Sequence, residues 1–96
     1  MADNLVLAGF RAIDGSSMDL VKKNIQNHMR RISELTKKME NLHITLKTLH
    51  EREKSEKYDI RTKLLDNGKV YVSHAIDRNL FAAIDAALEK LVRELR

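Results

Sequence analysis

Basic side chains are the residues of this sequence most able to do chemistry, because they recur at helical spacing in two segments. Residues 18–39 hold six Lys or Arg against two acidic residues, which equals the net charge of +4 of the whole chain. Cations in such rows neutralise the phosphates of RNA, although a solvated helix face carries similar charges. The cations of the first segment are Lys22, Lys23, Arg30, Arg31, Lys37 and Lys38, and those near the end of the second are Lys90, Arg93 and Arg96.

Other reactive residues do not form a catalytic pattern. The histidines are His28, His43, His50 and His74, and none stands four residues from another as in a helical metal pair. The chain has no Cys to complete a zinc site. Gly9 and Gly15 are too far apart for a glycine-rich phosphate loop. We therefore predict no catalytic residue, no metal and no cofactor. The enzymatic alternative is a small hydrolase of acyl phosphates, in which Arg11 beside Gly9 would hold the phosphate.

Length and composition limit the class of protein. A chain of 96 residues forms one domain, residues 1–96, which buries about 60% of the surface of the unfolded chain. No apolar run approaches the roughly 18 residues of a membrane span, and the first residues do not resemble a signal peptide. We expect a soluble, cytoplasmic protein without a membrane partner. Its sequence pI near 9.5 favours an anionic partner such as RNA.

Two amphipathic helices are predicted to position the cations. From residue 18 to about residue 38, apolar residues step by three or four positions, which places them on one side of a helix. They are Val21, Ile25, Met29, Ile32, Leu35 and Met39. Residues 77–96 repeat this spacing from Leu80 to Leu95. Ser16, three residues before Asp19, resembles a capping box for the first helix, and Asp77 or Asn79 can cap the second.

Four strands complete the predicted fold. We expect strands at about residues 4–12, 41–47, 57–65 and 69–76, from β-prone or alternating residues. Gly9 could mark a bulge or a close backbone approach. Asn67-Gly68 predicts a tight hairpin turn, and residues 50–56 should be an exposed, mobile connection. The order strand, helix, three strands, helix predicts a two-layer α+β sandwich, with both helices on one face of a mostly antiparallel four-stranded sheet.

The open face of this sheet offers a second route to RNA. Tyr71 could stack on a base there, next to a group of cations. Those cations are Lys47, Arg61, Lys63 and Lys69. We favour an ordinary solvated sheet face, because such platforms usually stack two or three bases and this strand offers one aromatic residue.

The two helical segments resemble a known family. Residues 82–95, A-A-I-D-x-x-x-E-K-L-x-R-x-L, are similar to the C-terminal helix of ribosome hibernation-promoting factors and ribosome-associated inhibitors. Asn79-Leu80-Phe81 replaces the D-M-Y triplet that usually precedes this helix. Residues 21–32, V-K-x-x-I-x-x-H-M-x-R-I, are similar to the first helix of the family, which assigns Lys22, His28 and Arg31 to its basic positions.

The resemblance implies a fold and a function. The family fold is often compared with double-stranded-RNA-binding domains. A short member would occupy the mRNA and tRNA channel of the small ribosomal subunit through basic residues on its helices, and would keep the ribosome idle. The candidate nucleic-acid-binding residues that the resemblance implies here are Lys22, Lys23, His28, Arg30, Arg31, Lys90 and Arg93. Its partner would be ribosomal RNA rather than DNA, and a second hibernation factor is a further candidate partner. The alternatives are a domain that binds free structured RNA and the acyl phosphate hydrolase.

Overall fold

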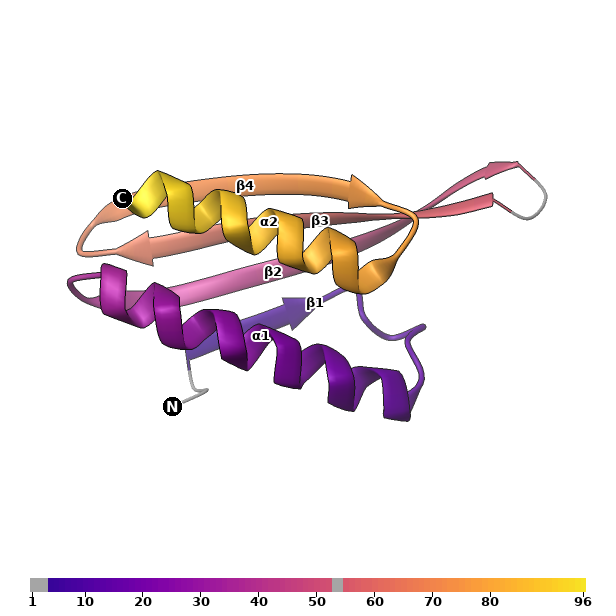
Figure 1. Cartoon of the computed structure of the whole chain (residues 1–96), viewed down its shortest axis with the longest axis horizontal. Helices are drawn as coiled ribbons and strands as arrows, with labels where there is room; N and C mark the ends of the chain where they lie inside the picture. Colours follow the sequence, from indigo (N-terminus) through magenta and orange to yellow (C-terminus); the bar gives the residue numbers. More distant parts are fainter. Residues whose placement is uncertain (1–3, 53–54) are drawn as a thin grey trace.

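The computed structural model describes residues 4–52 and 55–96. Its elements are β1 (Leu5–Ala8), α1 (Gly15–Leu35), β2 (Met39–Arg52), β3 (Ser55–Asp66), β4 (Lys69–Asp77) and α2 (Leu80–Leu95). The strands form one sheet in the order β1-β2-β3-β4, with β1 parallel to β2 and the other pairs antiparallel. Both helices lie on one face of the sheet (Figure 1). The predicted α+β fold, with this order of elements, is therefore confirmed.

The core lies between the helices and the sheet. Val21, Ile25 and Ile32 of α1 are fully buried, so the predicted apolar stripe of this helix is confirmed. The strands contribute Leu42, Ile44, Leu46, Ile60 and Leu64, and α2 contributes Ala83, Ile84, Ala87, Leu88 and Leu91. Each large side chain buried here stabilises the fold by roughly 1.5–3 kcal/mol relative to its exposed state. The packed helices thus form one rigid layer that holds the basic side chains.

Side-chain oxygens fix where the helices begin. Asp14 is the N-cap of α1, and its Oδ1 accepts a 2.7 Å hydrogen bond from the Ser17 amide. The predicted capping box was wrong, because the Ser16 hydroxyl donates to Asp14 instead. For α2, Asn79 is the N-cap, with its Oδ1 3.0 Å from the Ala82 amide nitrogen. Asp77 instead accepts from the Asn79 amide.

The first strand is shorter than predicted and ends at Ala8 rather than near residue 12. Gly9 follows with a φ of +84°, and a Cβ at this position would lie 2.1 Å from the backbone oxygen of Leu46. Only glycine permits such a close approach of two backbones. The chain then turns inward, and Phe10 joins the core. Gly9 therefore marks a close backbone approach, not a bulge.

The connection predicted as exposed and mobile is mostly a β-ribbon. β2 continues to Arg52 and β3 begins at Ser55, with His50 paired to Glu56. Residues 53–54 lie outside the described residues. Pairing with β1 ends at Thr45, so this end of the hairpin projects beyond the sheet (Figure 1). The predicted exposure is confirmed at His50 and Glu56, but the strands extend further than predicted. Backbone hydrogen bonds hold this ribbon, and these leave no apolar pattern in the sequence.

The opposite end of the sheet is closed by the predicted turn. Asn67 and Gly68 have φ angles of +50° and +82°, as a tight hairpin turn requires. The buried carboxylate of Asp66 accepts hydrogen bonds from the amides of Lys37 and Lys38, at 3.2 Å and 2.7 Å. α1 therefore ends at Leu35 rather than near residue 38, because the connection to β2 is held in an extended form against this turn.

Candidate nucleic-acid interface

A groove between α1 and α2 brings several of the predicted binding residues together. It encloses about 160 Å³. Its lining residues are His28, Arg31, Glu89, Val92, Arg93 and Arg96. Three arginines against one glutamate give this groove a positive charge. Three of the predicted residues, His28, Arg31 and Arg93, thus line one site.

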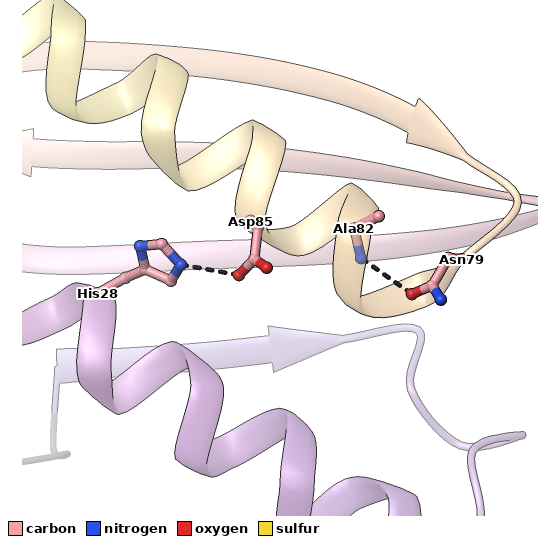
Figure 2. A network of polar contacts seen from close by, with 4 residues as sticks. All are labelled: His28, Asn79, Ala82 and Asp85. Atoms are coloured by element: carbon pink, nitrogen blue, oxygen red, sulfur yellow. Dashed lines mark hydrogen bonds and ion pairs between the residues drawn. The ribbon is translucent and has the colours of Figure 1, made fainter.

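His28 joins the two helices across this groove. Its Nε2 lies 2.9 Å from Oδ1 of Asp85 on α2 (Figure 2). The His28 side chain is only 19% exposed, whereas that of Asp85 is 51% exposed. This contact holds the helices at a fixed separation, and it directs the imidazole toward α2. The cations on the rim that remain exposed to solvent are Arg31, Arg93 and Arg96.

The positions of these arginines follow from helical spacing. Arg31 comes three residues after His28, so both project from the flank of α1 that faces α2. On α2, Arg93 and Arg96 are also three residues apart, next to the C-terminus of the helix, where its dipole favours cations. Arg93 and Arg31 are exposed, and their side chains make no hydrogen bond or ion pair with other residues in the described ranges. Their guanidinium groups are free to bind phosphate oxygens in pairs of hydrogen bonds.

The remaining predicted residues lie outside the groove. Lys22 is nine residues, or two and a half turns, before Arg31, which places it on the opposite flank of α1. Lys23 and Arg30 are exposed and do not line the groove. Lys90 donates a 2.8 Å hydrogen bond to the backbone oxygen of His74 on β4. Lys90 therefore attaches α2 to the edge strand of the sheet, away from α1.

Two charged lining residues were not among the predicted binding residues. Arg96 and Glu89 line the groove on either side of Arg93 along α2. The signal for both was present in the sequence, because positions 89, 93 and 96 are four and three residues apart and share one side of the helix. The sequence alone does not tell which flank of α2 faces α1, so this signal could not be used.

The open sheet face lacks the aromatic residue assigned to it. Tyr71 pairs with the buried Leu64 and packs against the core, so it lies on the face covered by the helices. Val70 and Val72 occupy the open face instead, with 54% and 63% of their surface exposed. This placement excludes the stacking platform with Tyr71, which the sequence did not favour over an ordinary solvated sheet face. The other aromatic residues, Phe10, Tyr58 and Phe81, are also in the core or packed against it.

The enzymatic alternative gains no support from the described residues. The backbone oxygen of Leu46 occupies the space beside Gly9 that a phosphate bound near Arg11 would need. Within residues 4–52 and 55–96, no group of three metal-ligating side chains comes together. No helix in the same ranges has the length and apolar character needed to cross a membrane.

Comparisons with known proteins agree with this geometry. The family described as "Sigma 54 modulation protein / S30EA ribosomal protein" matches residues 13–96. A ribosomal subunit interface protein from Coxiella burnetii has a similar structure, with a TM-score of 0.63 and 15% identity over 95% of this chain and 91% of that one. The N-terminal domain of Protein Y from Thermus thermophilus gives a TM-score of 0.57 and 21% identity, with the same coverage. No curated protein matches the chain.

Proposed function

Because the chain belongs to the family of sigma-54 modulation and S30EA ribosomal proteins, we propose that it binds the small ribosomal subunit in the cytoplasm and inhibits translation. In this proposal it occupies the channel of mRNA and tRNA and keeps the ribosome idle. The family is one of ribosome-binding factors that are not enzymes. The prediction of a binding module rather than an enzyme is therefore confirmed.

The observation that carries the proposal is the positive groove between the helices. Arg31, Arg93 and Arg96 meet there on two packed helices, so the backbone positions from which they extend are set before binding. Phosphates of ribosomal RNA would exchange their counterions for these guanidinium groups, which favours binding through the release of ions. Such contacts recognise the shape of an RNA rather than its sequence. The names of the similar structures, a ribosomal subunit interface protein and Protein Y, support the same partner.

The groove assigns different roles to the predicted residues. Arg31 and Arg93 would contact RNA directly, and Arg96 joins them. His28 would act through Asp85 by holding the two helices at the spacing that the RNA requires. Lys22, Lys23 and Arg30 would add long-range attraction from the rest of α1, while Lys90 would orient α2 on the sheet. A second hibernation factor stays a candidate partner.

A charge reversal tests the groove. We expect the double variant Arg31→Glu/Arg93→Glu to lose at least about 100-fold in affinity for purified small subunits, because two charge-assisted contacts disappear. Cosedimentation at fixed ionic strength measures this loss. The matched control is Lys47→Glu/Lys63→Glu, which makes the same change of charge on the open sheet face, where both lysines are exposed. The control should lose several-fold at most.

Three outcomes would count against the proposal. Unchanged cosedimentation of the groove variant would show that these arginines do not dock the protein. An equal loss in both double variants would show that net charge, not the groove, drives binding. Tight binding to naked duplex RNA, together with poor competition against tRNA on the subunit, would favour the alternative of a domain for free structured RNA.

A further inference from the structure

A second cavity lies at the end of the molecule where both helices begin. It encloses about 390 Å³, which falls within the roughly 300–1,000 Å³ typical of small-molecule sites. The groove between the helices, at about 160 Å³, is smaller than that range. The cavity is lined by Ala12, Ile13, Asp14, Ser17, Tyr58, Arg78, Asn79, Leu80 and Phe81. These residues come from the start of α1, from β3 and from the turn between β4 and α2.

The lining combines aromatic and apolar surface on one side. Tyr58 and Phe81 are half-buried and pack partly against the core, so their rings are held in place while part of each faces the cavity. Ile13 and Leu80 add aliphatic surface. A nucleobase can stack on a flat, fixed ring. Such stacking does not depend on the identity of the base, because every base has a flat aromatic face. Two rings meet at this cavity, whereas the smaller pocket beside the turn of Asn67 is lined by the single ring of Tyr71.

The polar residues at the cavity include one exposed cation and two helix caps that each have a side-chain oxygen already in use. Arg78 is exposed and makes no hydrogen bond or ion pair with the other described residues. Asp14 Oδ1 is occupied by the Ser17 amide and the Ser16 hydroxyl, while the Asn79 side-chain oxygen is occupied by Ala82. Arg78 is the only cation among the residues that line the cavity, so its guanidinium would hold an anion. The Asp14 carboxylate would repel that anion toward Arg78.

We propose that this cavity binds a nucleoside monophosphate unit, with its base against Tyr58 and Phe81 and its phosphate on Arg78. The unit could belong to a free nucleotide or to an unpaired nucleotide of RNA. The site goes beyond the positive groove, which binds phosphates but offers no ring for stacking. The inference rests on the proposed function only in taking RNA as one source of the nucleotide.

An NMR titration of the ¹⁵N-labelled chain tests the site directly, with AMP, adenosine and inorganic phosphate as separate probes. We expect AMP to shift the amides of residues 12–17 and 78–81, with a lower Kd than adenosine or phosphate. An adenosine pentanucleotide distinguishes the sources. It should bind more tightly than AMP if the site takes RNA, and no more tightly if the site takes a free nucleotide.

Variants test which residues contact the phosphate of the ligand and which contact its base. Arg78→Gln should weaken AMP binding about ten-fold and leave adenosine binding unchanged, since only the phosphate contact is lost. Phe81→Leu should weaken AMP and adenosine alike, by roughly ten-fold. Tyr58→Leu provides a second test of stacking if Phe81→Leu unfolds the protein, which the same spectra report. The matched control, Lys63→Gln on the open sheet face, should change none of these affinities.

The inference is overturned if AMP produces no shifts, or if AMP and phosphate shift only the residues around Arg31 and Arg93. Its failure can be separated from that of the proposed function. If the cavity does not bind AMP while the chain still cosediments with small subunits, only the nucleotide site is wrong. If AMP binds and cosedimentation fails, the ribosomal function is wrong and the nucleotide site stands.

Discussion

Single side chains decide where the helices start, and Asp14 is the clearest case. Its carboxylate caps α1 and also lines the cavity at the start of the two helices. The hydrogen bond from the Ser17 amide, followed by those from the hydroxyls of Ser17 and Ser16, lowers the pKa of Asp14 below its ordinary value. A lowered pKa in the folded state means that the charged carboxylate favours folding.

The first prediction at this scale concerns pH. The stability that comes from the Asp14 charge is present above the ordinary pKa of about 3.9, and it disappears as the pH falls through the lowered value. Asp14→Asn keeps an oxygen that can cap the helix but cannot titrate. We therefore expect the wild type to be more stable than Asp14→Asn at pH 7, and this difference to vanish in acid below pH 4. Urea unfolding at several pH values measures it.

A control separates charge from capping. Asp14→Ala removes the cap at every pH, so it should be the least stable of the three proteins in neutral solution. If the gap between the wild type and Asp14→Asn stays constant from pH 7 into strong acid, the charge of Asp14 does not contribute to folding.

At the scale of elements, the β2–β3 ribbon differs most from the sequence analysis, which predicted a mobile connection at residues 50–56. Pairing of β2 with β1 ends at Thr45, and pairing of β3 with β4 ends at Tyr58. The paired residues His50 and Glu56 are exposed, so they contribute backbone pairing but no part of the apolar core.

Shortening the ribbon should therefore leave the fold intact. We expect replacement of residues 50–56 by Asn-Gly, which joins Leu49 to Lys57 through a two-residue turn, to change the free energy of unfolding by less than about 1 kcal/mol. Chemical denaturation measures the change. The same replacement should leave AMP binding and cosedimentation unaffected, because neither site includes these residues. A loss of cosedimentation would identify the ribbon as a contact with the ribosome.

β4 shows why one face of a strand could not be assigned from the sequence. Val70 and Val72 alternate with Tyr71 and Ser73, so both faces of the strand have apolar character. The register decides the outcome, since Leu64 and Thr62 of β3 face the helices and place Tyr71 and Ser73 beside them. In contrast, the clean alternation of β2 and the stripes of both helices were sufficient to predict which residues are buried. Alternation identifies a strand reliably, but it identifies a face only when one face is polar.

On the scale of the whole molecule, the charge is distributed unevenly among the surfaces. The groove has three arginines, while the open sheet face combines exposed valines with lysines. The sequence located the excess of positive charge in residues 18–39, but it could not show which of these cations face α2 and which face away from it. Lys22 and Arg31, for example, lie on opposite flanks of α1 because they are nine residues apart. The fold was thus predictable from periodicity, whereas the site depends on how the two helices face each other.

Salt dependence tests the binding mode of the molecule as a whole. If the protein docks through RNA phosphates, the logarithm of its affinity for small subunits should fall steeply and linearly with the logarithm of the salt concentration. Arg93→Gln removes one phosphate contact, so it should reduce that slope by about one. Val72→Thr, a control on the open face, should not alter the slope. A flat salt response would instead indicate a protein partner bound through apolar contacts.

The carboxylate of Asp66 has a consequence for how the molecule moves. It accepts the amides of Lys37 and Lys38, and the Asn67 amide donates in return to the backbone oxygen of Lys38. Two loops that are 28 residues apart in the chain are thus tied together at one end. Opening fluctuations should therefore be smallest at this end, where the start of β2 and the turn between β3 and β4 must move together.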